Sequence, residues 1–260
     1  MRQPRLTKAN YYADKYYWSA SFVKEMLACP ARALAGLSGE YEREASTALL
    51  VGSYVDAYFD GKLMYRRFAS EHPEIFNSRT GELKKDFVQA NEMIARAQQD
   101  TVFMSYIKGQ RQKILTGTID GIPFRCKMDF YIKGTRIVDL KTVKDFDPVF
   151  REGDGRISFA DYWRWPLQMA IYQELVRQNT GDVLPCYLAC ISKQTPPDIL
   201  LVEIPQYTLD AEMEVLKEKL PYLDAMRQGV VEPERCCKCA YCRSSRKITE
   251  PVSLDDLAEF

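Results

Sequence analysis

Two aspartates near the middle of the chain, Asp129 and Asp139, have the type and spacing of residues that bind a divalent cation. Lys141 follows two positions after Asp139, at the end of an apolar segment. Two neighbouring carboxylates repel each other strongly unless a cation lies between them. Oxygen ligands of this kind suit Mg²⁺ or Mn²⁺ rather than zinc. The three residues therefore indicate a cation site with a lysine beside it.

Strands are predicted on both sides of the first aspartate. Residues 114–143 alternate between apolar and polar types, which is the period of a β-strand. Asp-Gly at 120–121 and Lys-Gly at 133–134 are hairpin signals. This pattern predicts three antiparallel strands, over about residues 113–119, 122–131 and 135–142.

The second hairpin decides whether the aspartates share a face of the sheet. A three-residue loop over 132–134 would place Asp129 opposite Ile137 and Lys127 opposite Asp139. Side chains alternate along a strand, so both aspartates and both neighbouring lysines would then lie on one face. A two-residue loop would put the aspartates on opposite faces. The alternative interpretation is a row of solvated charges on an exposed sheet.

Helices are expected around these strands. The helical period and the capping signals predict helices over about residues 19–29, 45–60, 86–97, 162–178 and 209–228. Two more strands are predicted over 185–193 and 199–205. Gly52 lies in the middle of a predicted helix, where glycine usually marks close packing or the close approach of a ligand. This order predicts a compact α/β domain with helices around a mixed central sheet.

The aspartates and Lys141 also carry a resemblance. Asp129 with Asp139-Leu140-Lys141 resembles the D…(D/E)xK core of the PD-(D/E)xK nuclease superfamily. Within that superfamily the chain most resembles the RecB/RecE-like exonucleases, especially phage-type exodeoxyribonuclease VIII proteins. Three further segments are similar to motifs of RecB-like nucleases, in the same order along most of the chain: Ser19-Ala20-Ser21 to Cys29-Pro30 (SxS…CP), Gly52 to Asp56 (GxxxH) and Gln168 to Tyr172 (QxxxY).

This resemblance implies a restriction-endonuclease-like core and a Mg²⁺- or Mn²⁺-dependent exodeoxyribonuclease that hydrolyses phosphodiester bonds at linear DNA ends for recombination. It implies that Asp129, Asp139 and the Leu140 carbonyl bind metal, while Lys141 orients or activates the attacking water. Asp56 stands where the family has a metal-binding histidine, and a buried capping role is the alternative for it. The residues that the resemblance places in the catalytic site are Asp129, Asp139, Lys141, Gln168 and Tyr172.

Gln168 and Tyr172 share one helix face because they lie four residues apart. An amide there can bond a phosphate or base of the substrate. A buried structural hydrogen bond is the competing interpretation.

Four of the eight cysteines lie within seven residues, and Cys236, Cys239 and Cys242 have C-x₂-C-x₂-C spacing. Clustered cysteines more often bind metal than form disulfides. Some RecB-like nucleases, of the AddB and Cas4 types, hold an iron–sulfur cluster with one N-terminal and three C-terminal cysteines. Cys29 occupies the position of that first ligand. The resemblance therefore implies a 4Fe-4S cluster on Cys29, Cys236, Cys239 and Cys242, with Zn²⁺ or free thiols as alternatives.

The composition limits the kinds of metal site, partner and cellular location that we expect. The single histidine, His72, excludes histidine-rich metal sites and zincin motifs. Lysine and arginine together number 36, as do aspartate and glutamate, so the net charge is zero and does not point to a nucleic-acid partner. An oligomer that encloses DNA would, however, need less basic surface. No apolar run reaches membrane length and no signal peptide is evident, so a cytoplasmic protein without a membrane partner is expected.

We therefore expect one nuclease domain over residues 1–260, with a helical segment over about 1–110 and a cysteine cluster over about 233–245. The expected partners are linear DNA ends, with a phage single-strand annealing protein and further copies of the chain as candidates. Two alternatives stay open: a Cas4-like single-strand nuclease, and an inactive nuclease fold that binds DNA or protein. Retention of both aspartates and the lysine argues against the inactive fold.

Overall fold

The computed structural model describes residues 6–42, 46–248, 250–251 and 253–254. Its internal contacts divide the chain into a first unit, residues 1–21 and 44–220, and a second unit, residues 22–43 and 221–260. The divisions fall inside helix α1 (Ala20–Ala28) and inside helix α9 (Gln206–Arg227), the latter at Pro221. A proline within a helix removes a backbone hydrogen bond, so this is a natural place for such a division.

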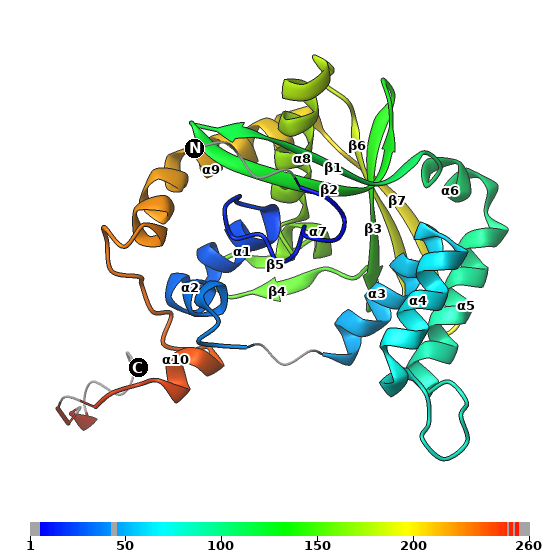
Figure 1. The fold of residues 1–260 in the computed structure, drawn as a ribbon, viewed down its shortest axis with the longest axis horizontal. Coiled ribbons are helices and arrows are strands. Elements are labelled where there is room, and N and C mark those ends of the chain that lie inside the picture. The colour runs from blue at the N-terminus through cyan, green and yellow to red at the C-terminus, as the bar shows by residue number, and fades with distance from the viewer. Residues whose placement is uncertain (1–5, 43–45, 249, 252, 255–260) are drawn as a thin grey trace. The chain divides into compact units, whose positions relative to one another are not determined.

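The strands of the first unit form a five-stranded mixed sheet (Figure 1). Its order is β1-β2-β3-β6-β7, in which β3 and β6 are parallel and the other neighbours are antiparallel. The strands cover β1 (Gln110–Ile119), β2 (Ile122–Ile132), β3 (Arg136–Val143), β6 (Cys186–Ser192) and β7 (Ile199–Ile204). The mixed α/β prediction and all five predicted strands are confirmed.

Helices pack on one face of this sheet around a hydrophobic core. The core contains Tyr54 and Phe87 from helices together with Phe130, Val138 and Leu140 from the strands. The helices on this side are α3 (Thr47–Asp60), α4 (Lys62–Glu71), α5 (Lys85–Gln99) and α6 (Thr101–Tyr106), with a 3₁₀ turn at Pro73–Ile75. The predicted start of α3 at position 45 lies outside the described residues, and the Ser46 side chain caps the helix instead.

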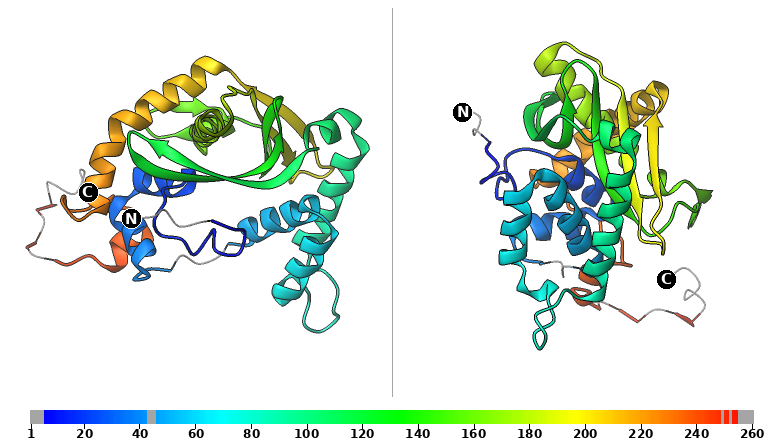
Figure 2. Two further views of the ribbon diagram at one scale, coloured as in Figure 1. Left: turned by 45° about the horizontal axis from the view of Figure 1, so that its top comes forward. Right: turned by 90° about the vertical axis from the view of Figure 1, so that its right-hand side faces the viewer.

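Helix α8 (Trp165–Thr180) lies inside the curve of the sheet, where Figure 2 shows it almost end-on. It is part of the crossover that two parallel strands require, because β3 and β6 cannot be joined by a tight turn. Its side chains are buried on nearly all sides from Trp165 to Gln173. Asp139 and Lys141 alternate with the core residues Val138 and Leu140 and therefore face α8.

The segment before α8 differs from the prediction of one helix over 162–178. The chain instead forms α7 (Phe159–Tyr162), breaks at Arg164, which has a φ of 50°, and restarts as α8 with Pro166 in its first turn. Proline is favoured in the first turn of a helix and disfavoured in the interior, which explains why a new helix starts here. The loop predicted before it contains a two-stranded ribbon of β4 (Val149–Arg151) and β5 (Gly155–Ile157).

The aromatic residues near the N-terminus mostly pack against the first unit. Tyr11, Tyr17 and Trp18 are buried, and Trp18 stacks on Phe124 of β2 with ring centroids 6.2 Å apart. Tyr12 is largely exposed. The buried rings therefore hold this N-terminal segment against the rest of the first unit.

The second unit consists of short helices around the cysteines. It contains most of α1, helix α2 (Pro30–Ser38), the end of α9 and helix α10 (Ala240–Ser244). Its core consists of Cys29, Ala31 and Cys242, with Cys236, Cys239 and Tyr241 packed beside them.

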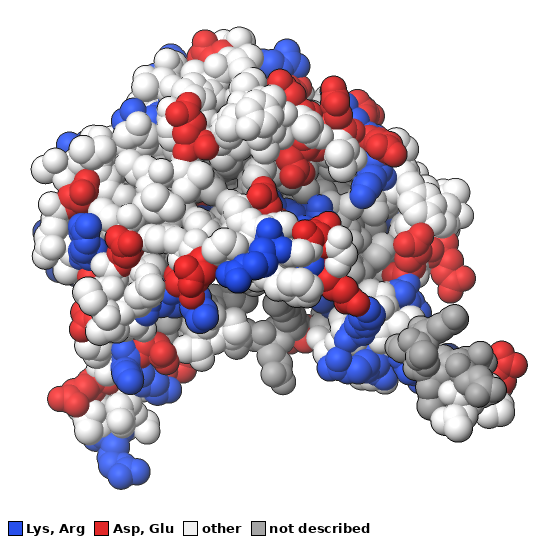
Figure 3. Space-filling model, turned by 180° about the vertical axis from the view of Figure 1, so that it is seen from behind, with Lys and Arg blue, Asp and Glu red and all other residues white. Residues whose placement is uncertain are grey.

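Acidic and basic side chains are interspersed on one face of the molecule (Figure 3). On the face shown in Figure 3, blue and red side chains alternate and form no single-sign area that dominates it. This matches the equal numbers of acidic and basic residues. Among the described residues, no helix combines the length and apolar character that a membrane crossing demands.

Candidate active site

Asp129 and Asp139 meet where the pairing of β2 and β3 ends. The last pairs are Ile132 with Arg136, Tyr131 with Ile137, and Phe130 with Val138. The expected pairing of Asp129 with Ile137 is therefore wrong by two residues, and each aspartate is the next residue beyond the paired segment. The shift by two keeps the parity, so the aspartates still share a face.

The turn explains the shift. The Thr135 N–H donates to the Ile132 carbonyl at 2.9 Å, and Gly134 has a φ of 65°. Glycine adopts this left-handed conformation at little cost, and here it does so one residue earlier in the loop than expected. The three-residue loop consequently covers 133–135 instead of 132–134.

Asp129 takes the place of a sheet hydrogen bond at this point. Its Oδ2 accepts a hydrogen bond from the Leu140 N–H at 3.0 Å. The side chain thereby satisfies a backbone donor that strand pairing would otherwise use. This contact fixes the carboxylate of β2 against the backbone of β3.

Lys141 and Gln168 hold Asp139 from two sides. Asp139, only 2% exposed, forms an ion pair through Oδ2 with Lys141 Nζ. Gln168 Nε2 donates to Asp139 Oδ1 at 2.8 Å, and Gln168 Oε1 accepts from Lys141 Nζ at 3.5 Å. Gln168 therefore orients the carboxylate and the ammonium group at once, and its buried amide acts on these two groups.

Tyr172 fixes helix α8 to the sheet. Its hydroxyl accepts from Gln168 Nε2 at 3.1 Å and donates to the Lys127 carbonyl at 3.3 Å. Burial first, and then the charge of Asp139, raise the Tyr172 pKa well above its ordinary value, so the hydroxyl stays protonated as this donor. Trp165 lies on the same helix, and its ring is 5.3 Å from Lys141 Nζ. The sequence reasoning missed Trp165, although its position three residues before Gln168 places it on the same face.

Asp56 joins the two aspartates from helix α3. A side chain at Gly52, one turn earlier, would place its Cβ 3.3 Å from Thr142 Oγ1. Glycine thus lets α3 approach β3 closely, as its position in the sequence suggested. Asp56 and Asp129 are bridged by the Gln112 amide, whose Nε2 lies 3.4 Å from each Asp56 oxygen and 3.2 Å from Asp129 Oδ1. No sequence motif marks Gln112, and the sequence reasoning missed it.

The pKa shifts in the site indicate that its carboxylates are not fully balanced by positive charge. Burial first, and then the charges of Asp139 and Asp56, raise the Asp129 pKa well above its ordinary value. Burial is also the main cause that raises the Asp56 pKa to about 6. Burial acts to lower the Lys141 pKa, but the charges of Asp139 and Asp129 outweigh it and raise the pKa. Three carboxylates with one close ammonium group form a donor set that fits a hard divalent cation.

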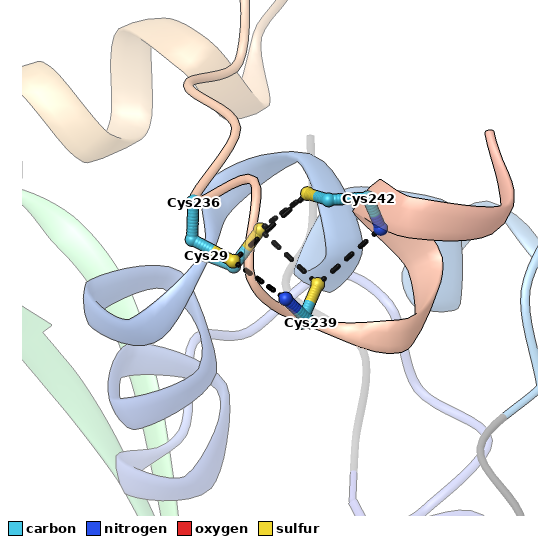
Figure 4. A group of neighbouring side chains, drawn as sticks. All are labelled: Cys29, Cys236, Cys239 and Cys242. Atoms are coloured by element: carbon cyan, nitrogen blue, oxygen red, sulfur yellow. Dashed lines mark hydrogen bonds between the residues drawn. The ribbon is translucent and has the colours of Figure 1, made fainter. Parts of the chain in front are cut away.

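The four cysteines predicted to act together lie together in the second unit (Figure 4). Cys29 Sγ is 3.5 Å from Cys242 Sγ and 3.9 Å from Cys239 Sγ, and Cys236 Sγ is 3.9 Å from Cys242 Sγ. All four sulfurs lie within 4.8 Å of one another. A tetrahedral ion with bonds of about 2.3 Å separates its ligand sulfurs by about 3.8 Å. The arrangement therefore fits one thiolate-bound ion.

The ionisation of these thiols supports the same interpretation. Burial acts to raise the Cys236 pKa, but backbone N–H groups of Cys239 and Lys238 outweigh it and lower the pKa to about 6. Burial and the contact with Cys29 raise the Cys242 pKa to about 12. Four crowded thiols cannot all ionise without a cation between them. Cys237, the remaining cysteine of the cluster, is exposed and lies outside the group.

Comparisons with known proteins found a family and a solved structure that are similar to this chain. The model of a PDDEXK-like domain of unknown function (DUF3799) matches residues 19–245. A crystal structure of a putative exonuclease from Eubacterium rectale is similar, with 41% sequence identity and a TM-score of 0.93 over 98% of each chain. No curated protein matches the chain.

Proposed function

Because this chain belongs to the PDDEXK-like family of DUF3799, we propose that it is a divalent-metal-dependent nuclease that hydrolyses phosphodiester bonds at linear DNA ends. The observation that carries this proposal is the meeting of Asp129, Asp139 and Asp56 beside Lys141 in the first unit. The similar structure from Eubacterium rectale supports exonuclease activity.

The residues have distinct tasks in this proposal. Asp129, Asp139, Asp56 and the Leu140 carbonyl would hold Mg²⁺ or Mn²⁺. When bound, the metal supplies Lewis-acid stabilisation of the charge on the phosphate and lowers the pKa of the attacking water. Lys141 orients that water and offers a positive charge to the transition state.

Gln168 serves this chemistry by positioning. It fixes Asp139 and Lys141 relative to each other through one amide. Tyr172 in turn fixes Gln168 to the backbone of β2. A displacement of about 1 Å in such groups can cost about 100-fold in rate. The contacts of Gln168 and Tyr172 therefore support catalysis by keeping Asp139 and Lys141 in position.

The β4–β5 ribbon and the neighbouring α7 supply the surface that we assign to DNA binding. Phe150 is exposed and pairs across the ribbon with Arg156. On the other face, Arg151 donates to the carbonyls of Asp161 and Tyr162 at 2.7 Å each, which ties the ribbon to α7. Trp163 follows directly and is 56% exposed. Exposed aromatic rings with arginine can stack on bases of a single strand and contact phosphates.

A row of aromatic contacts leads from the segment before this ribbon, through α7, to the proposed catalytic lysine, Lys141. Phe146 lies 5.7 Å from Phe159 and Phe159 lies 5.9 Å from Trp165, measured between ring centroids. Trp165 is the residue that covers Lys141. The segment from β3 to α8 is therefore a suitable wall for a DNA end beside the scissile phosphate.

Among the finer possibilities we favour a RecE-like exonuclease acting in phage recombination, with a single-strand annealing protein as partner and a homo-oligomer as its working form. A Cas4-like nuclease that trims single strands is the second candidate, favoured by the exposed aromatic residues Phe150 and Trp163. Both candidates use the same catalytic residues and differ in the strand that they accept.

The decisive experiment is digestion of linear, nicked and circular DNA labelled at the 5′ or 3′ end, with and without Mg²⁺ or Mn²⁺. Degradation of linear DNA only, and only with metal, is expected for the wild type. Asp139→Ala should abolish it without unfolding the protein, because the metal loses a ligand and Lys141 loses its partner. Glu82→Ala is a matched control, since Glu82-Leu83-Lys84 is an exposed acid-x-lysine triplet outside the site. Cleavage in EDTA, or an active Asp139→Ala protein, would refute the proposal.

We also propose that the four cysteines of the second unit bind one structural metal centre. The sulfur separations support a single zinc ion, whereas the resemblance to iron–sulfur RecB-like nucleases supports a 4Fe-4S cluster. A cubane places each cysteine on a different iron, so it requires sulfurs that lie farther apart. Coordination would tie Cys29 to the cysteines beyond residue 235 and constrain a long stretch of unfolded chain.

Metal analysis of protein purified without oxygen tests this centre. One equivalent of zinc in colourless protein supports the single ion, and iron with sulfide in brown protein supports the cluster. Cys29→Ser should lower the metal content and destabilise the second unit, whereas Cys237→Ser, a change at the exposed neighbour, should alter neither. Wild-type protein that contains neither metal, and in which Cys236 and Cys239 react freely with a thiol reagent, would refute the shared site.

A further inference from the structure

Gln112 has an unusual backbone for a residue within a strand. Its φ is 52°, a left-handed value that side chains other than glycine adopt at a cost in conformational energy. Its neighbours Arg111 and Lys113 pair normally with Phe130 and Met128 of β2. The same register places Gln112 opposite Asp129. The strand is therefore distorted at the one residue that lies opposite a catalytic aspartate.

The amide of Gln112 is used at one end only. Its nitrogen faces Asp56 and Asp129, as described above, while its Oε1 is buried and has no hydrogen-bond partner. The residue is 7% exposed, so water contact through its surface is small. A buried polar atom without a partner is costly, and native proteins keep few of them. Backbone distortion and an unsatisfied oxygen at one residue point to a function.

The present orientation of the amide follows from the charges around it. Two carboxylates attract the N–H₂ end, and they would repel the carbonyl end. A divalent cation between the same carboxylates reverses this preference, because it attracts a carbonyl oxygen and repels N–H groups. A half-turn about the Cγ–Cδ bond exchanges the two ends without a change in side-chain volume. Glutamine carbonyl oxygens are suitable ligands for hard cations.

We propose that Gln112 is a further residue of the metal site: its N–H₂ group bridges Asp56 and Asp129 in the metal-free protein, and its Oε1 turns toward the cation when the metal binds. In the metal-free protein the neutral amide holds the two carboxylates together through its nitrogen. In the metal-bound protein its oxygen becomes a ligand of the cation. This inference depends on the divalent-cation part of the proposed function and not on the nature of the DNA substrate.

A purely structural bridge predicts the opposite effect on affinity. If Gln112 only donates its N–H groups to the carboxylates, it competes with the metal for them. Removal of the amide would then leave the Mn²⁺ affinity unchanged or increase it. If Oε1 turns toward the metal, removal of the amide must weaken binding. The sign of the change therefore separates the two roles.

The test uses full-length protein freed of divalent metal by a chelator and Mn²⁺ as the probe, with affinity measured by calorimetry and by electron paramagnetic resonance. Gln112→Met, which keeps the length of the side chain but removes both ends of the amide, should weaken Mn²⁺ binding by about 10-fold or more. Gln173→Met is the matched control. Gln173 is also 7% exposed, but its amide bonds Leu184 and Gln206 away from the aspartates, so Mn²⁺ affinity should stay at the wild-type value.

Gln112→Glu provides the second variant, and it keeps an oxygen while removing the N–H donors. It should bind Mn²⁺ at least as tightly as the wild type, while its metal-free form melts at a lower temperature because a fourth carboxylate then joins Asp56, Asp129 and Asp139. Unchanged or tighter binding by Gln112→Met would overturn the proposal. Loss of binding by Gln112→Glu equal to that of a folded Gln112→Met protein would also overturn it. Absence of Mn²⁺ binding in the wild type would instead refute the proposed function.

Discussion

In metal-free protein, Asp56 should lower the stability of the first unit as the pH rises from 5 to 7, whereas Cys236, whose pKa is lowered to about 6, acts in the opposite direction in the second unit. Asp56 has its pKa raised from 3.8 to about 6, chiefly by burial, so the folded state holds a proton that the unfolded state has already lost. Stability from such a group is fully present below the unfolded pKa and is lost as the pH rises through the folded pKa. Asp129, whose pKa is raised well above its ordinary value, acts in the same direction.

The size of the effect follows from these values. Proton linkage for Asp56 alone gives a loss of about 1 kcal/mol in the free energy of unfolding between pH 5 and pH 7. For a chain of this size, that corresponds to a fall of roughly 2–4 °C in melting temperature. Saturating Mn²⁺ should oppose the loss at pH 7, because the ionised carboxylates are the form that binds metal.

Thermal unfolding in EDTA, followed by circular dichroism at several pH values, measures the effect. Asp56→Asn should flatten the dependence by about the amount calculated for Asp56, since the amide cannot titrate. Asp86→Asn, an exposed change at the start of α5, should keep the dependence of the wild type. An equal pH dependence in Asp56→Asn and the wild type would refute the interpretation of a buried carboxyl that lacks its cation.

Three further outcomes are expected. Gly117→Ala should cost about 1–3 kcal/mol in urea unfolding, because its Cβ would lie 2.8 Å from Cδ2 of the buried Leu175 on α8 and would displace Gln178 from the Thr118 N–H; a stability equal to the wild type would contradict the close approach of α8 to β1. Trp163→Leu should remove most of the fluorescence quenching by single-stranded DNA, and quenching of wild-type size in this variant would exclude the ribbon and α7 surface from binding. Tyr172→Phe should lower the rate of DNA cleavage by about 10-fold through a less ordered Gln168 while Mn²⁺ affinity stays close to normal. Parallel losses of rate and metal affinity would instead place Tyr172 in metal binding.

The strands and the parity of the aspartates were predictable because they depend on local pattern. Alternation of apolar residues and Gly134 in the hairpin are sufficient to define β2 and β3, and an error of two residues in register does not change the face of Asp129. Gly52 was also informative, since a missing side chain within a helix is a local signal of close approach.

The unpredicted features depend on contacts between distant segments. Gln112 acquires its importance from Asp56 and Asp129, which lie on two other elements, and no local pattern distinguishes it from a surface glutamine. The break before α8 does have a local signal in Pro166, but the apolar residues on both sides of it continue the helical period and mask the break. The β4–β5 ribbon is three residues per strand, which is shorter than alternation can reveal.

The position of the β4–β5 ribbon has a consequence for what the sheet can tolerate. The ribbon and α7 lie in the crossover between β3 and α8, after Lys141 and before Gln168. The five-stranded sheet takes no strand from residues 144–164, and the buried face of α8 begins only at Trp165. Changes of length or sequence in this interval therefore alter the surface beside the proposed site while the register of β3 with β6 stays fixed.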